Sequence, residues 1–96
     1  MMTKLTNEEQ RTCFRLLDDY GKTHHKLFLA ELIPTDTASY FACFRPLGGG
    51  ADDSNCYASE YLKFEIQELR TMASSQSVPP DVTDKLSAAL ARIGST

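Results

Sequence analysis

The sequence lacks the features that would reveal a biochemical activity directly. It has no catalytic signature, no complete set of metal ligands and no phosphate-binding loop of the kind that holds nucleotides. Its longest uninterrupted apolar run, residues 27–30, is far shorter than the roughly 20 residues that cross a bilayer. The N-terminus also lacks the charged and then apolar layout of a secretory signal. We therefore expect a cytoplasmic protein that does not span a membrane.

An excess of positive charge is also missing. The chain has 10 Lys and Arg side chains against 13 Asp and Glu side chains, which gives a formal net charge of −3. Proteins that bind nucleic acid through phosphate contacts usually carry a basic patch. The last predicted helix has Lys85 and Arg92, but acidic side chains lie among them. We expect no direct contact with nucleic acid, and a DNA-binding accessory factor is an alternative.

Cysteine is scarce. Three cysteines in a short chain without a secretory signal are typical of reduced thiols. Cys43 and Cys56 flank a glycine-rich loop, so a disulfide between them is the alternative. On the loop-entropy model, such a bond would stabilise the fold by about 3 kcal/mol.

The two histidines, His24 and His25, are neighbours in the sequence. Adjacent side chains on a helix point about 100° apart, whereas metal-binding histidines on a helix are usually four residues apart. We therefore interpret His24 as a packed or hydrogen-bonded core residue and expect no metal and no cofactor. The alternative is a small metal-binding or ligand-binding sensor that uses His24 with Cys13, Cys43 or Cys56.

A long amphipathic helix is predicted for residues 6–33. Thr6 and Glu9 form a capping box in sequence, and Pro34 disfavours a helical conformation before it. Apolar residues occupy a stripe roughly 160° wide on one side. The helix is long for a 96-residue chain, so we expect a kink or a close contact at Gly21, or an end that a second chain covers.

Two more helices are predicted downstream, at residues 56–74 and 81–93. The aromatic segment 36–45 reads as a short helical or irregular stretch. A strand is the alternative there, but no second run of alternating residues offers a convincing partner. The sequence thus predicts an all-α protein, a small bundle of three main helices in a single domain of residues 1–96. The expected core consists of Phe14, Leu17, Tyr20, Phe28, Leu62, Ile66, Leu69, Leu86, Leu90 and Ile93.

The second predicted helix has more apolar surface than one packing contact needs, about 200° of its circumference. Tyr, Phe and Met are enriched in the cores of protein interfaces, so this arc is a candidate surface for a partner, with the core of the same chain as the alternative. The predicted partner-binding residues are Tyr57, Tyr61, Phe64, Glu65, Glu68 and Met72.

These features favour a non-enzymatic interaction protein, a regulator, inhibitor or antiactivator that binds a larger protein such as a transcription regulator. A homodimer would hide the remaining apolar surface. With two helices and a glycine-containing linker, part of the layout resembles the small helical antiactivators of quorum-sensing transcription factors. Small phage-encoded inhibitors of bacterial machinery would have a similar layout.

Overall fold

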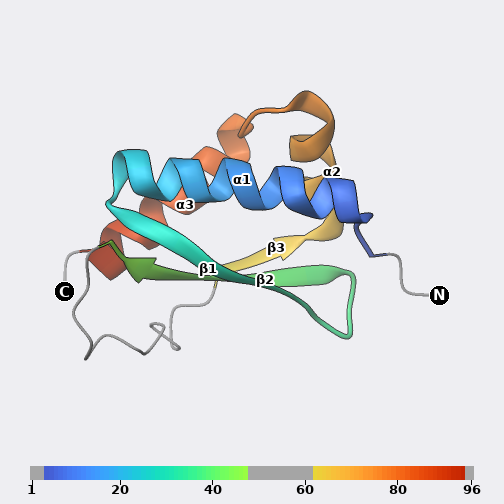
Figure 1. The fold of residues 1–96 in the computed structure, drawn as a ribbon, viewed down its shortest axis with the longest axis horizontal. Helices are drawn as coiled ribbons and strands as arrows, with labels where there is room; N and C mark the ends of the chain where they lie inside the picture. Colours follow the sequence, from blue (N-terminus) through green and yellow to red (C-terminus); the bar gives the residue numbers. More distant parts are fainter. Residues whose placement is uncertain (1–3, 48–61, 95–96) are drawn as a thin grey trace.

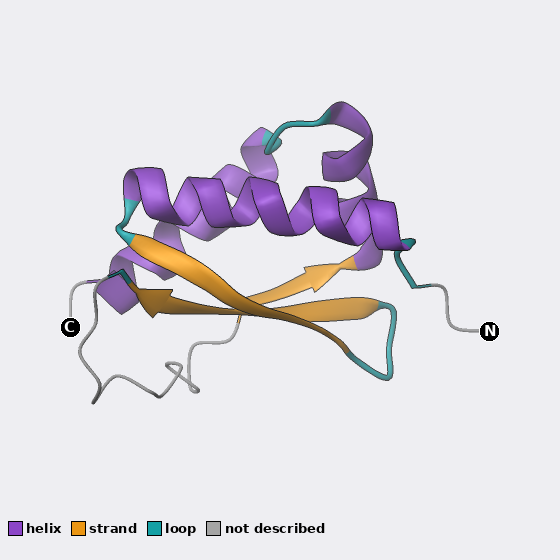
Figure 2. Ribbon diagram, in the orientation of Figure 1, coloured by secondary structure: helices purple, strands orange, loops and turns teal. Residues whose placement is uncertain are grey.

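The computed structural model describes residues 4–47 and 62–94. Within these ranges the chain forms three helices and a three-stranded antiparallel sheet with the strand order β1-β2-β3. The helices lie together on one side of the sheet, which gives the molecule two layers (Figures 1 and 2). The elements are α1 (Asn7–His24), β1 (Leu27–Pro34), β2 (Ser39–Pro46), β3 (Leu62–Glu65), α2 (Ile66–Ser75) and α3 (Pro80–Gly94).

The all-α prediction is therefore wrong: this is a mixed α/β structure, and the predicted bundle of helices is absent from the described ranges. The first helix begins as expected but ends at His24 instead of continuing to residue 33. Lys26 adopts a left-handed backbone conformation with φ of 57°, which turns the chain out of the helix. The residues that follow pair with β2 as strand β1.

A β-bulge explains why this strand was not recognised in the sequence. The side chains of Leu27, Leu29 and Leu32 are all buried, but the last two are three residues apart, which breaks the two-residue period of a regular strand. The pairing with β2 shifts between Leu29 and Glu31, so one extra residue is accommodated there. The bulge keeps the apolar side chains on one face, and the resulting spacing fits a helix as well as a strand.

The segment 36–45, predicted to be helical or irregular, is mostly strand β2, which was the alternative. It pairs with β1 on one side and β3 on the other. Both partners fall in stretches that the sequence predicts to be helical, which leaves β2 without a predicted neighbour. Of the predicted helix 56–74, residues 62–65 form β3 and α2 begins at Ile66, while residues 56–61 lie outside the described ranges. The third predicted helix corresponds closely to α3.

The N-terminal cap of α1 is confirmed. The backbone N–H of Glu9 donates to Thr6 Oγ1 at 3.1 Å, and the Glu9 side chain accepts from the Thr6 backbone N–H at 2.9 Å. The backbone hydrogen bond from Thr6 is the main cause that lowers the pKa of Glu9. Burial opposes it, and the charge of the nearby Arg70 guanidinium lowers the pKa by a smaller amount. The cap thus fixes the start of the helix and holds Glu9 in its charged form.

The core lies between the helices and one face of the sheet. Six of the expected core residues are buried: Leu17, Leu62, Ile66, Leu69, Leu86 and Leu90. Phe14 and Tyr20 are partly buried and pack against this cluster. Phe28 is also partly buried, on the other face of the sheet, and the side chain of Ile93 lies outside the description. The inner face of the sheet supplies Leu27, Leu29, Leu32, Tyr40, Ala42, Phe44, Leu62 and Phe64.

The close contact expected at Gly21 is present. A Cβ atom on this residue would lie 2.6 Å from the carbonyl oxygen of Leu27 and 3.1 Å from the ring of Phe44. Both distances are shorter than the roughly 3.5 Å of an unstrained contact. Only glycine therefore allows the last turns of α1 to lie this close to the start of β1.

None of the helices in the described ranges is long and apolar enough to cross a membrane. This agrees with the short apolar runs of the sequence.

We predict that Gly21→Ala destabilises the protein by about 1–3 kcal/mol, because the added methyl group must displace the Leu27 backbone. The higher helix propensity of alanine, worth about 1 kcal/mol, opposes this loss only in part. Urea unfolding followed by circular dichroism measures the change. Thr23→Ala, at an exposed position of the same helix, is the control and should leave stability unchanged or slightly raised. Equal stability of both variants would show that the close approach is absent.

Candidate interaction surface

The two faces of the sheet differ in composition and burial. The inner face is covered by the helices, whereas the outer face carries two large apolar side chains that are substantially exposed, Ile33 and Phe41, each with 37% of its surface accessible. These two residues are directly paired across β1 and β2. Cross-strand neighbours have Cβ atoms only about 5 Å apart, so the pair forms one continuous apolar patch. We call it the Ile33–Phe41 pair.

Strand alternation places a defined set of side chains around this pair. Residues next to an inward-pointing neighbour point outward, because successive side chains of a strand alternate between the two faces. Charged residues of both signs therefore flank the Ile33–Phe41 pair. The outward-pointing residues are Phe28, Glu31 and Ile33 from β1, Phe41, Cys43 and Arg45 from β2, and Lys63 and Glu65 from β3. Not all of them are accessible, since Cys43 is buried and Phe28 and Arg45 are half-buried.

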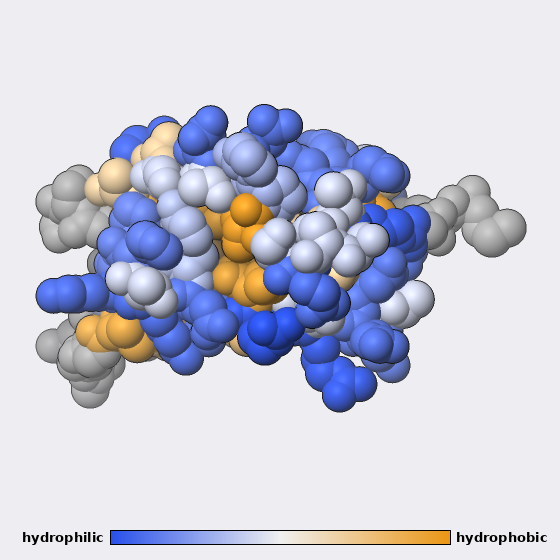
Figure 3. Space-filling model, turned by 90° about the horizontal axis from the view of Figure 1, so that it is seen from above, coloured by the Kyte–Doolittle hydropathy of each residue, from blue (hydrophilic) through white to orange (hydrophobic). Residues whose placement is uncertain are grey.

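The helical side of the molecule has a different character. Seen from above it is mostly hydrophilic, with apolar side chains in a patch near the centre and others toward one end (Figure 3). Among the described residues, the large apolar side chains classed as exposed are Ile33, Phe41 and Leu47, and none of them belongs to a helix. An exposed apolar pair on a rigid sheet is the stronger candidate for a contact surface.

The free edge of β1 is protected from strand addition. The backbone N–H of Leu29 donates to Asp18 Oδ1 on α1 at 2.9 Å. Pro34, at the end of the same strand, has no N–H to offer. Asp18 also forms an ion pair with Lys22, whose ammonium lies 2.8 Å from Asp18 Oδ2. The hydrogen bond with Asp18 raises the pKa of Lys22. An incoming strand therefore finds few open partners at this edge of the sheet.

Phe64, Met72 and Glu68, half of the predicted partner-binding residues, have other roles in the structure. Phe64 and Met72 are completely buried in the core, so neither side chain is accessible to a partner. Glu68 accepts a hydrogen bond from the Glu65 backbone N–H at 2.9 Å and lies 3.3 Å from the Lys85 ammonium, so it caps α2. Glu65 is exposed on the outer face of the sheet. Tyr57 and Tyr61 lie outside the described residues, and their role stays a prediction.

Sequence reasoning missed Ile33, Phe41, Glu31 and Lys63 as surface residues. Along β2, the inward-pointing Tyr40, Ala42 and Phe44 alternate with the outward-pointing Phe41, Cys43 and Arg45. Because nearly all of these residues are apolar, the sequence does not show which side of the strand faces the core.

The expected core position of His24 is not observed, since the side chain is exposed. Its ring stacks on Tyr20 with 4.4 Å between ring centroids, and Nδ1 lies 3.3 Å from the Tyr20 carbonyl oxygen. In the described parts of the chain, no group of three or more His, Cys, Asp or Glu side chains could hold a metal ion.

The cysteines also differ from the expectation of three reduced thiols. Cys43 is disulfide-bonded, whereas Cys13 is free and buried, and Cys56 lies outside the described residues. The Sγ atom of Cys13 donates to the carbonyl oxygen of Leu69 at 3.1 Å. Burial raises the pKa of this thiol from 9.0 to about 11, and the charge of Glu9 adds to the shift. Because metal ligation and nucleophilic chemistry need the thiolate, this environment suits neither.

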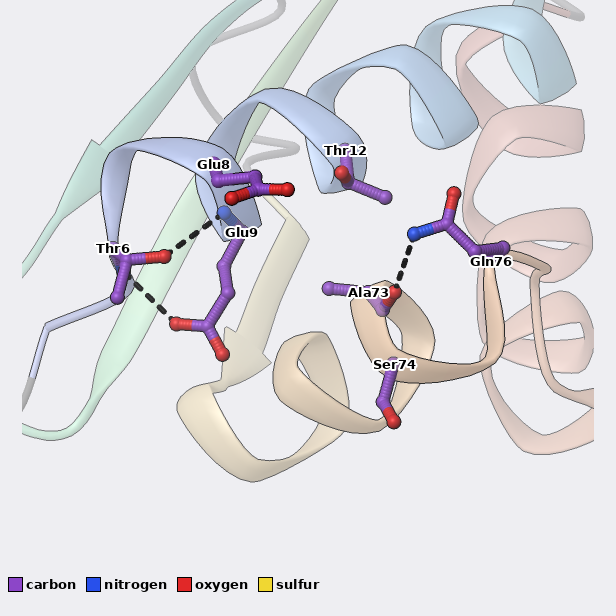
Figure 4. Close-up of a pocket in the computed structure, with 7 residues that line it drawn as sticks. All are labelled: Thr6, Glu8, Glu9, Thr12, Ala73, Ser74 and Gln76. Atoms are coloured by element: carbon purple, nitrogen blue, oxygen red, sulfur yellow. Dashed lines mark hydrogen bonds between the residues drawn. The ribbon is translucent and has the colours of Figure 1, made fainter.

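A small polar pocket of about 160 Å³ lies between the first turns of α1 and the end of α2 (Figure 4). Two of its polar side chains, Glu9 and Gln76, already have hydrogen-bond partners within the protein. Glu9 is bound to Thr6, and Gln76 donates to the Ala73 carbonyl at 2.9 Å and accepts from Arg15 at 3.2 Å. We regard this pocket as a packing groove between helices. It is lined by Thr6, Glu8, Glu9, Thr12, Ala73, Ser74 and Gln76.

Comparison with known proteins gives no family for this chain. No protein-family model matches it, and no curated protein and no solved structure matches it either. Arguments about function therefore rest on the geometry of the outer sheet face.

We predict that Cys13 resists alkylation in the native state. Iodoacetamide at pH 8 reacts with the thiolate, which burial disfavours, so labelling should be at least about 100-fold slower in buffer than in 8 M urea. Peptide mass spectrometry resolves Cys13 from the other two cysteines. Labelling in buffer at the rate measured in urea would mean that the helix–helix contact around Cys13 is open.

Proposed function

We propose that this protein is a non-enzymatic interaction module, a regulator or inhibitor that binds a larger protein through the outer face of its sheet. The observation that carries the proposal is the exposed Ile33–Phe41 pair on β1 and β2. Aromatic and aliphatic side chains that are exposed on a rigid surface and bordered by charges are typical anchors of protein interfaces.

The arrangement of the sheet supports this proposal. The inner face is fixed by a continuous core that includes Tyr40, Phe44 and Phe64, so the outer face does not need to reorganise to bind. A preorganised surface loses less conformational entropy on association. Because the outer face has both acidic and basic side chains around the pair, it suits a protein surface better than a polyanion. The proposal therefore includes no direct contact with nucleic acid.

The Cys43 disulfide counts against the cytoplasmic location expected from the sequence, because disulfides form and persist in oxidising compartments. The redox state of Cys43 in cells tests the location. Rapid alkylation of intact cells, followed by mass spectrometry of the protein, reports that state. A reduced Cys43 supports the cytoplasm, and an oxidised Cys43 contradicts it.

Phe41→Ser and Ile33→Ser are expected to abolish capture of the partner while the protein stays folded. Anchor side chains at the centre of an interface contribute about 2 kcal/mol or more, which corresponds to a roughly 30-fold loss of affinity. Quantitative mass spectrometry of proteins retained from native lysate measures this, with melting temperature as the check on folding.

Leu47→Ser is the matched control, because Leu47 is even more exposed, at 45%, but lies beyond the end of β2. A protein that is lost with both outer-face variants and retained with Leu47→Ser is the partner. If every captured protein is retained equally by all three variants, the outer face is not the binding surface.

A further inference from the structure

The loop that joins β1 to β2 lies at the end of the hairpin and turns away from the helices (Figure 1). We call residues 34–38 the hairpin tip. Four of these five residues are exposed, and Thr35 is half-buried. Ile33, which is 37% exposed, comes directly before the tip on β1. The tip therefore projects from the surface, and an accessible apolar side chain lies at its base.

A cluster of hydroxyl groups fixes the shape of the hairpin tip. The hydroxyl oxygens of Thr35 and Ser39 are 2.7 Å apart, and Thr37 Oγ1 lies 3.1 Å from Ser39 Oγ and 3.2 Å from Thr35 Oγ1. The backbone N–H of Thr37 also donates to Thr35 Oγ1 at 3.2 Å. Ser39 is only 1% exposed, so the cluster rests on a buried hydroxyl. Hydrogen bonds of this kind, from side chains to each other and to the nearby backbone, stabilise turns.

The base of the hairpin tip is tied to two neighbouring elements. The backbone N–H of Thr35 donates to the carbonyl oxygen of Ser39 at 3.1 Å, which closes the hairpin. On the other side, the N–H of Ile66, the first residue of α2, donates to the carbonyl oxygen of Ala38 at 3.1 Å. The tip is thus a preorganised projection, which loses little conformational entropy when it binds.

Asp36 is the single charged residue of the segment 33–39, whose sequence is Ile-Pro-Thr-Asp-Thr-Ala-Ser. Its side chain is exposed, and none of the ion pairs found among the described residues includes it. A hard cation needs several oxygen ligands, and the tip has no second acid to help hold one. A lone carboxylate on a projecting turn is better suited to an arginine or lysine of another molecule.

We infer that the hairpin tip inserts into a concave site of a larger protein, where Asp36 pairs with a basic side chain and Ile33 packs against an apolar wall. This inference rests on the proposed function and names the kind of partner. Projecting loops that are held rigid insert into concave sites of their partners. The negative charge of the tip disfavours nucleic acids and anionic membranes, which would repel it.

Photocrosslinking from the tip tests this inference. A photoreactive phenylalanine analogue replaces Ala38, which is exposed, and the full chain is irradiated in native lysate. We expect an adduct with one larger protein, and mass spectrometry should place the crosslinked peptide in a cleft that contains an arginine or lysine. Asp36→Lys in the same chain should lower the yield of this adduct at least about tenfold, because like charges then meet in a site shielded from water.

Asp84→Lys, at an exposed position of α3, makes the same charge change away from the tip and is the matched control. It should leave the yield of the adduct unchanged. Circular dichroism of each variant confirms that the fold is intact.

Three outcomes would overturn the inference. They are an adduct whose yield Asp36→Lys does not lower, an adduct only with a second copy of this chain or with lipid, and the absence of any protein adduct from position 38. In each case the proposed function still stands if Phe41→Ser loses partner capture, and it fails separately if capture is unchanged.

Discussion

The close approach of α1 to the start of the β1–β2 hairpin is the contact on which the rest of the structure depends. Gly21 provides the space for it, since any side chain there would meet the Leu27 carbonyl oxygen. One helical turn earlier, Asp18 accepts the Leu29 N–H and ties the same helix to the same strand. Together these two residues set the position of α1 over the inner face of the sheet. This position buries Leu17 and Cys13 in the core.

This placement explains the difference between the two faces of the sheet. The helices cover the inner face, and Asp18 also protects the edge of β1, so neither is open to a partner. The outer face keeps exposed apolar surface at Ile33 and Phe41, with charged side chains around it. The binding of a larger protein is proposed for this surface.

The sequence predicted the start of α1 and the span of α3, but it did not predict the end of α1 or the sheet. The capping box at Thr6, the special role of Gly21 and the span of α3 follow from local chemistry, which the sequence states directly. Strand β1 could not be predicted from periodicity, because its bulge changes the spacing of buried residues to one that a helix shares. With β1 predicted as helix, β2 has no predicted partner strand. Nearly all residues of β2 are apolar, so its pattern does not show which of them face the core.

Site-specific photocrosslinking tests the central claim most directly, namely that the outer face of the sheet is the contact surface of this protein. A photoreactive phenylalanine analogue is introduced at position 41 on β2, or at position 88, which is exposed on α3. We predict that crosslinked protein adducts form from position 41 and that position 88 gives none above background. Adducts that form from position 88 and not from position 41 would show that the helical side makes the contacts and would contradict this account.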